Sequence, residues 1–217
     1  MKVKWLGHAA FLITSDEGTK IVTDPYQPGM FGLNYGKIDE AADIVTVSHD
    51  HADHNYVQGV PGKPQVVKSS GTSKVKGIEF KGIPSFHDEK KGGERGQNTI
   101  FCFTVDGIRV CHMGDLGHTL SDREAKEVGS VDIMLIPVAG MYTVDAVAAG
   151  KIVDHLKPRV VIPMHFKTEK CPDFPVTDVK PFTAGKTNVK VADKTEVEFK
   201  KEQLPKATQI MVLKHTR

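Results

Sequence analysis

Four apolar runs that lie far apart in the sequence each end just before a histidine or an aspartate. The runs are "IVTVS", "IEFKGIPSF", "IRVCHMG" and "RVVIPM", and the residues that follow them are His49, His87, Asp115 and His165. Short apolar runs between turn residues are typical of β-strands. One site is commonly assembled from residues at the carboxyl ends of several strands. We therefore expect a fold that brings these four strand ends together.

Strand-like runs occur along the whole chain. The expected strands are Val3–Leu6, Ala10–Thr14, Lys20–Thr23, Ile44–Val47, Gln65–Lys68, Ile78–Ile83, Thr99–Val105, Ile108–His112, Ile133–Val138, Val160–Met164, Asn188–Val191, Val197–Lys200 and Gln209–Leu213. Asp106-Gly107 predicts a two-residue hairpin turn, because both residues tolerate positive φ. The prevalence of strands places the chain in the α/β or α+β class, with two or more layers.

Helices are expected at fewer places. Ser121 and Glu124 form a capping box that opens a short helix, and Gly129 closes it. Residues 143–156 predict a second helix, which ends before Pro158. Thr143 is the simplest N-cap for it. A third helix could begin within residues 53–58.

Composition narrows the class of protein. With 39% hydrophobic residues among 217, the chain can bury roughly 70% of its unfolded surface, so we expect one compact domain over residues 1–217. The net charge is only +2 and the basic residues are scattered, which argues against a nucleic-acid surface. The apolar part of "MKVKWLGHAAFLIT" is too short for a signal peptide or a membrane span. Three cysteines without a CxxC pair favour a reducing, cytoplasmic location.

The segment "SHDHADHN" concentrates three histidines and two aspartates within residues 49–54. In an extended segment residues i and i+2 point the same way, so His49 and His51 can reach one ion. A turn at Ala52 would direct Asp53 and His54 towards a second centre. Imidazole and carboxylate ligands suit zinc, and also manganese or iron. An isolated HxH pair is usually structural, but burying so many polar groups without a cation would cost on the order of several kcal/mol. Metal binding is therefore the favoured interpretation.

The order of these motifs resembles that of the metallo-β-lactamase superfamily. The matching segments are "GHAAFLI", "TDPY", "SHDHADHN", "SFHD", "MGDLG", "IPVAGMYTVDAV" and "IPMHF". They span almost the whole chain and look closest to a branch of small metal-dependent hydrolases that includes ascorbate-6-phosphate lactonases. The resemblance implies an α/β fold, a four-layer αββα sandwich of two mixed β-sheets flanked by helices, in a single hydrolase domain.

The resemblance also implies a set of metal ligands. Carried over residue by residue, it assigns His49, His51 and His87 to a first ion. It assigns Asp53, His54 and His165 to a second ion, with Asp115 bridging the two. The implied cofactors are two divalent metal ions, with Zn²⁺ preferred over Mn²⁺ or Fe.

A paired metal site predicts hydrolysis. Two such ions can share a water and yield hydroxide near neutral pH, which would attack a small ester, lactone, amide or phosphodiester. Asp53 could orient the nucleophile or carry a proton. His8 and His118 are further catalytic candidates, although each could equally be a hydrogen-bonded loop histidine. Asp24 could hold a ligand histidine or cap the next turn.

Two other classes of function remain open. One is an iron-dependent oxidoreductase on the same fold, similar to persulfide dioxygenases, and the other is a metal-binding protein without catalysis. The expected partner is a small-molecule substrate, and a homo-oligomer is left open. The loops at 25–36, 88–97 and 171–187 are expected to shape the substrate pocket.

Overall fold

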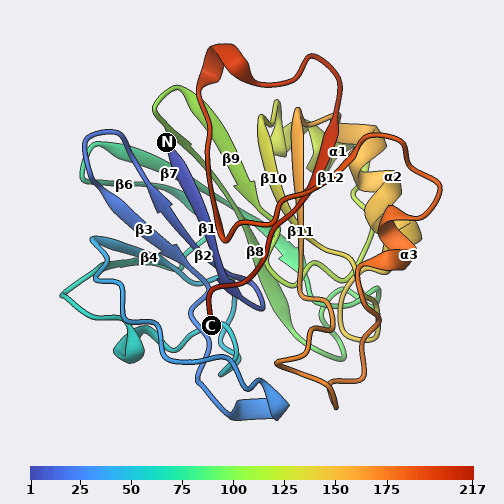
Figure 1. The fold of residues 1–217 in the computed structure, drawn as a ribbon, viewed down its shortest axis with the longest axis horizontal. Helices are drawn as coiled ribbons and strands as arrows, with labels where there is room; N and C mark the ends of the chain where they lie inside the picture. Colours follow the sequence, from blue (N-terminus) through green and yellow to red (C-terminus); the bar gives the residue numbers. More distant parts are fainter.

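Two mixed β-sheets form the body of the protein in the computed structural model, which describes residues 1–217 (Figure 1). The six-stranded sheet contains, in spatial order, β13 (Glu196–Glu198), β1 (Lys2–Gly7), β2 (Ala10–Thr14), β3 (Lys20–Thr23), β4 (Ile44–Thr46) and β5 (Gln65–Val67). Strands β1, β2 and β3 are antiparallel neighbours, whereas β3, β4 and β5 run parallel. This sheet supplies the strand that leads into the histidine-rich segment.

The eight-stranded sheet supplies the other three strand ends. Its order is β12 (Val189–Val191), β14 (Gln209–Val212), β11 (Val160–Met164), β10 (Ile133–Pro137), β9 (Ile108–His112), β8 (Gln97–Val105), β7 (Ile78–Phe86) and β6 (Gly71–Val75). The strands from β6 to β9 are antiparallel, and from β9 onwards they are parallel. All residues of β10 and β11 are buried, which is typical of central parallel strands covered on both faces.

Few helices accompany the sheets. They are α1 (Asp122–Val128), α2 (Ala146–Leu156) and α3 (Lys180–Thr183), with single 3-10 turns at η1 (Met30–Gly32), η2 (Val57–Gly59) and η3 (Lys201–Gln203). The three α-helices lie on the right in Figure 1, on the outer side of β10 and β11. The predicted fold class, two mixed sheets with helices outside, is therefore confirmed, and the buried apolar side chains form one contiguous core.

Local signals located several elements correctly. Asp106 and Gly107 have φ values of 50° and 73°, as a tight hairpin between β8 and β9 requires. The Ser121 hydroxyl accepts from the Glu124 main-chain N–H, while the Glu124 side chain accepts from the Ser121 N–H. Gly129 ends that helix with φ 74°.

The structure differs from the expected local structure at three places. Helix α2 begins at Ala146, because the Asp145 carboxylate accepts from the Ala148 N–H at 2.8 Å and is the N-cap instead of Thr143. Within residues 53–58 only the 3-10 turn η2 begins, at Val57, and no α-helix forms, since the Tyr56 N–H bonds to the Pro25 carbonyl. The edge strand β6, "GTSKV", was missed because it lacks an apolar face.

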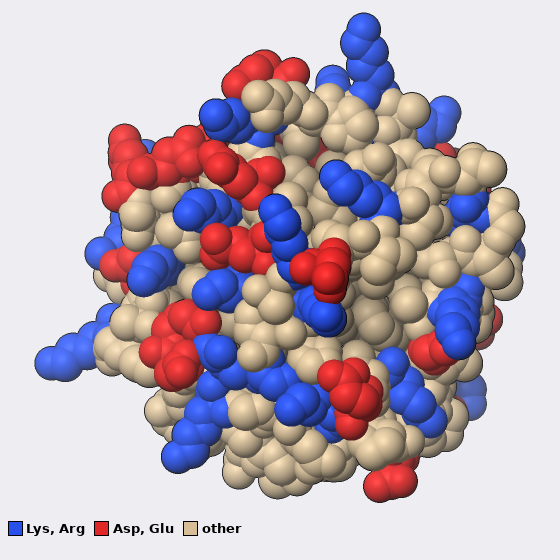
Figure 2. Space-filling model, viewed as in Figure 1, with Lys and Arg blue, Asp and Glu red and all other residues tan.

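Basic and acidic side chains are interspersed on the face drawn in Figure 2, without a broad basic patch. None of the helices has the length and apolar character needed to cross a bilayer.

Candidate metal centre

The four strand ends meet at one point, as their sequence pattern predicts. His87, Asp115 and His165 follow β7, β9 and β11, and the 49–54 segment follows β4 of the other sheet. One oxygen of Asp115, Oδ2, lies 3.1 Å from His54 Nε2, 3.2 Å from His87 Nε2 and 3.2 Å from His165 Nε2. Three imidazole nitrogens thus surround a single buried carboxylate oxygen.

The side chains form two adjoining groups around that carboxylate. In the first group the ligand atoms of His49, His51 and His87 all lie within 4.8 Å of one another. In the second, the same limit holds for the atoms of four residues: His8, Asp53, His54 and His165. Asp115 Oδ2 contacts members of both groups. The structure therefore brings all seven predicted ligand residues close together, with His8 beside the second group and Asp24 beside His49 and His54.

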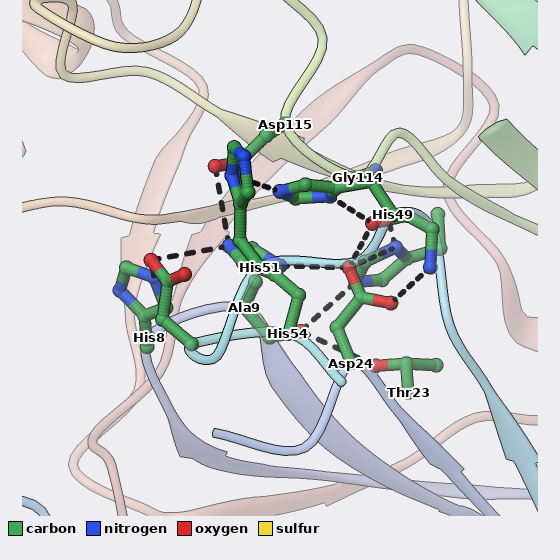
Figure 3. A network of polar contacts seen from close by, with 12 residues as sticks. His8, Ala9, Thr23, Asp24, His49, His51, His54, Gly114 and Asp115 are labelled. Carbon is green, nitrogen blue, oxygen red and sulfur yellow. Dashed lines mark hydrogen bonds and ion pairs between the residues drawn. The ribbon is translucent and has the colours of Figure 1, made fainter. Parts of the chain in front are cut away.

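Hydrogen bonds fix the far nitrogen of three of these histidines. The partners of Nδ1 are Ser48 Oγ for His49, Asp24 Oδ2 for His54 and the Tyr142 carbonyl for His87, at 2.9, 2.9 and 3.1 Å. Figure 3 shows Asp24 beside His54. A carbonyl or carboxylate partner requires the proton on Nδ1, which leaves a lone pair on Nε2. This is how ligand histidines are usually oriented in metal sites.

Several buried polar atoms at this centre lack a hydrogen-bond partner. They are Asp115 Oδ1, His165 Nδ1 and His54 Nε2, the last lying close to Asp115 Oδ2 but outside hydrogen-bond geometry. His49 Nε2 and His51 Nδ1 face each other at 3.0 Å. Unsatisfied buried polar atoms each cost roughly 1–3 kcal/mol. Cations would satisfy most of these atoms at once, so the donor set fits a metal site.

Electrostatics give the same indication. Burial would raise the pKa of Asp115, but His165 and His54 hold it well below its usual value. Burial would lower the pKa of His54, yet the Asp115 and Asp53 carboxylates raise it well above the ordinary range. Burial, reinforced by the charge on His54, lowers the pKa of His49 to about 3. The Asp115 and Asp53 carboxylates therefore favour a positive charge at the position of His54, and a metal cation would supply one.

Strained backbone positions the residues at several of these strand ends. His8, Asp24 and His165 have φ values of 51°, 38° and 54°, in the left-handed region that non-glycine residues seldom adopt. Such strain concentrates at functional sites, where the surrounding structure enforces it. The His165 N–H bonds to the His8 carbonyl at 3.2 Å, so the two segments hold each other.

The glycines of "MGDLG" permit close packing around Asp115. A Cβ on Gly114 would lie 2.3 Å from Asn98 Oδ1, and one on Gly117 would lie 2.2 Å from the carbonyl carbon of His87. Both positions therefore require glycine.

Asn98 is a functional residue that the sequence reading missed. Its Oδ1 accepts from the Asp115 N–H at 3.0 Å, while its Nδ2 donates to the Met113 carbonyl and to Ser85 Oγ. These bonds fix the main chain at the bridging position. The sequence carries no usable signal for it, because Asn98 lies between Gln97 and Thr99 at the polar start of β8, just before the strand expected at Thr99–Val105.

The additional catalytic candidates differ in position. His8 is buried, and its Nε2 lies 3.2 Å from Asp53 Oδ2 at the edge of the second group. Burial lowers the pKa of His8 to about 4. His118 lies outside both groups, and its ring nitrogens contact the Phe86 N–H and the Thr119 carbonyl. The structure therefore favours the loop interpretation of His118.

A cavity of about 500 Å³ opens over the centre. Its floor contains His51, Asp53, His87, Asp115 and His165, and its walls contain Phe31, Arg95, Tyr142, Phe174 and Pro175. Each of the three loops expected to shape the pocket contributes at least one of these wall residues, which confirms that prediction. The size is that of a small-molecule site.

Comparisons with known proteins agree with this geometry. Residues 2–165 match the family model described as a β-lactamase superfamily domain. A UPF0173 metal-dependent hydrolase of Pyrococcus furiosus is 31% identical over 77% of this chain and 85% of its own length. A related metal-dependent hydrolase of Archaeoglobus fulgidus is 29% identical over 83% of this chain and 87% of its own. A crystal structure from Thermotoga maritima, described as a candidate zinc-dependent hydrolase of the metallo-β-lactamase superfamily, is 33% identical, with a TM-score of 0.82 over 99% of both chains.

Proposed function

Because this chain belongs to the metallo-β-lactamase superfamily, we propose that it is a metal-dependent hydrolase with a two-ion centre. The first ion would be held by His49, His51 and His87. The second would be held by Asp53, His54 and His165, and Asp115 would bridge the two. The proposed substrates are small esters, lactones, amides or phosphodiesters.

The observation that supports this proposal most is the environment of Asp115. Its Oδ2 has three imidazole nitrogens within 3.2 Å, whereas its buried Oδ1 has no hydrogen-bond partner. A hydrogen-bonding role would leave at least one of these atoms unsatisfied. Asp115 would be satisfied as a ligand of the metal ions, whose positive charge its carboxylate would help to balance. The cluster offers imidazole and carboxylate donors and contains no cysteine. Such donors suit zinc, with manganese or iron as alternatives.

The residues around the ions have separate tasks. When bound, divalent ions supply Lewis acidity and a nucleophile at neutral pH. Asp53 lines the cavity and can accept or deliver a proton at Oδ2. His8 Nε2, 3.2 Å from that oxygen, holds the Asp53 carboxylate in place and is proposed as a positioning residue. Asp24, Ser48 and the Tyr142 carbonyl orient the ligand imidazoles. His118 is left out of the proposed reaction.

We also propose a single domain and a reducing compartment for this protein. A single domain over residues 1–217 is supported by the one contiguous core. A reducing compartment is supported by three cysteines that are all unpaired. The three relatives cited above are named as hydrolases, which favours hydrolysis over the oxidoreductase and non-catalytic alternatives.

Metal content tests the proposal directly. Elemental analysis of gently purified protein should find about two ions per chain. His51→Ala should lose close to one ion, and Asp115→Ala should lose both ions or bind them much more weakly, because the bridge is gone. His155→Ala, on the exposed face of α2, is the matched control and should keep two.

Activity provides the second arm. Zinc- and manganese-loaded protein should hydrolyse at least one member of a panel of lactones, thioesters, β-lactams and phosphodiesters. Both ligand variants should lose that activity while their far-UV circular dichroism stays unchanged. Protein that neither retains nor takes up metal would refute the two-ion centre, and oxygen consumption by iron-loaded protein would favour the oxidoreductase instead.

A further inference from the structure

One cationic side chain with a permanent charge lines the cavity over the centre. Arg95 is the only lysine or arginine among the ten residues that form its wall and floor. The other charged residues there are the carboxylates of Asp53 and Asp115, which belong to the proposed metal site. Arg95 is therefore placed to contact a part of the substrate that lies away from the ions.

The loop that carries Arg95 is held rigidly to the centre. Strand β7 ends at Phe86 and β8 begins at Gln97, so the connecting loop starts with the ligand candidate His87. The His87 N–H bonds to the Gly96 carbonyl at 3.0 Å and closes the loop. The position of Arg95 is thus fixed relative to His87 through the chain itself.

Asp88 organises the inside of this loop. Its carboxylate accepts from four main-chain N–H groups, those of Lys90, Gly92, Glu94 and Arg95, at 2.7–2.9 Å. The Arg95 main chain is therefore pre-positioned before any ligand arrives, which reduces the entropy lost on binding.

The guanidinium group itself has few protein partners. It makes no side-chain hydrogen bond, and its nearest carboxylate oxygen is Glu94 Oε2, 3.6 Å from Nη1. Glu94 bonds to Lys90 Nζ through its other oxygen at 2.5 Å, so it is shared between two cations. The Arg95 side chain is only 34% exposed. A half-buried guanidinium with free donors is suited to a planar anion.

Aromatic side chains form a continuous wall from Arg95 to the centre. The guanidinium carbon lies 5.7 Å from the ring centroid of Tyr142. The Tyr142 ring lies 5.5 Å from that of Phe174, which in turn lies 5.5 Å from His165. A ligand that spans from the ions to Arg95 would therefore pack an apolar portion against Tyr142 and Phe174.

We propose that Arg95 determines specificity by binding an anionic group, a carboxylate or a phosphate, on a substrate whose apolar portion packs on Tyr142 and Phe174. This inference rests on the proposed hydrolase function, because it takes the reacting bond to lie over the metal centre. It narrows the substrate class to anionic esters, lactones, amides or phosphate compounds with an apolar segment.

Equilibrium binding tests the inference without turnover. Phenylacetate, phenyl phosphate and the uncharged phenylacetamide are titrated by calorimetry into metal-loaded protein, either unaltered or carrying Arg95→Gln. The unaltered protein should bind at least one anion more tightly than the amide. Arg95→Gln should raise the dissociation constant of that anion roughly 10- to 100-fold. Phenylacetamide binding should change little. The anion with the larger loss identifies the group that Arg95 binds.

Two further variants separate specific binding from general charge. Lys91→Gln removes a positive charge from the same loop at an exposed residue outside the cavity, and it should leave all three affinities unchanged. Arg95→Lys should recover only part of the lost affinity, because lysine lacks the planar pair of donors. Direct coordination of the anions by metal would be the same in every variant.

The inference would be overturned if Arg95→Gln bound both anions as tightly as the unaltered protein, or if Lys91→Gln weakened them equally. It would also be overturned if neither anion bound better than the amide. Hydrolysis of the substrate panel by the same preparations reports separately on the proposed function. Failure of Arg95 as an anion site is therefore distinguishable from failure of the hydrolase assignment.

Discussion

Replacing Asp24 by asparagine should weaken metal binding, although Asp24 contacts no ion in the proposed arrangement. The buried Asp24 carboxylate accepts from the Ser48 N–H at 2.8 Å, from Ser48 Oγ at 2.5 Å and from His54 Nδ1 at 2.9 Å. Asparagine has nearly the same shape and tolerates the observed φ of 38°. The substitution therefore changes the hydrogen-bond donors and acceptors with little change in shape or backbone.

The consequence follows from where the protons lie. An amide nitrogen in place of Asp24 Oδ2 donates where the carboxylate accepted, so His54 can meet it only with an unprotonated Nδ1. The proton then lies on Nε2, the atom that faces Asp115. The Ser48 hydroxyl would likewise accept from the introduced amide and donate to His49 Nδ1, which is 2.9 Å away. Both imidazoles would lose the lone pair that faces the centre.

The expected loss is a 10- to 100-fold weaker metal affinity, roughly the usual effect of removing such an orienting partner. This corresponds to about 1.4–2.8 kcal/mol. The assay is competition for zinc against a chromophoric chelator, with circular dichroism to verify folding. Asp145→Asn is the matched control, because asparagine caps α2 as well as aspartate does. An Asp24→Asn variant with both affinities intact would show that the histidines need no orienting acceptor.

Three further predictions concern stability and packing. Removing the metal with a chelator should lower the melting temperature by roughly 5–10 °C, compared with protein at a free metal concentration of about 100 times Kd. Binding at that concentration stabilises the folded state by about 2.7 kcal/mol. An unchanged melting curve would contradict a metal that binds only to the folded state. Gly117→Ala should displace the His87 main chain and reduce the metal content of the protein. Gly150→Ala is the control, because its Cβ would meet nothing within 4 Å, and it should stabilise the protein through α2 by about 0.5–1 kcal/mol. Elemental analysis and urea unfolding measure the two effects, and equal behaviour of the two variants would refute the steric argument. Asn98→Ala should lower the free energy of unfolding by about 2–3 kcal/mol, because it strands a buried N–H and a buried carbonyl, while Asn188→Ala at an exposed site should change it little. Equal losses in urea titrations of these two asparagine variants would mean that burial of the Asn98 bonds is unimportant.

Most of the strands could be predicted because their signal is local. Four of them, at 10–14, 20–23, 108–112 and 160–164, have the bounds expected from apolar patterning alone. The strand at 71–75 could not be predicted, because it has no apolar face. Its hydrogen bonds to β7 define it as a strand. The cap of α2 was misplaced because Thr143 and Asp145 are both good caps by residue type. The Thr143 hydroxyl donates to the Val144 carbonyl at 3.3 Å, and the Asp145 carboxylate accepts from the Ala148 N–H at the start of the helix.

The orienting and wall residues were less accessible to sequence reading. Asn98 and Ser48 act through hydrogen bonds to segments 17 and 24 residues away, at Asp115 and Asp24. His118 is the opposite case, because its type and its closeness to Asp115 in sequence suggest a catalytic role, whereas its ring nitrogens contact only the Phe86 N–H and the Thr119 carbonyl. Residue type shows what a side chain can do, but only its neighbours show what it does.

By itself the sequence determined the donor types, the strand ends on which they lie and the family they resemble, because these depend on local pattern and residue chemistry. Only the tertiary structure decided which imidazole nitrogens face Asp115, which acceptors hold their Nδ1 atoms and which cation reaches into the cavity. Those features depend on contacts between chain segments that lie far apart in sequence, and no local pattern encodes the distances between them.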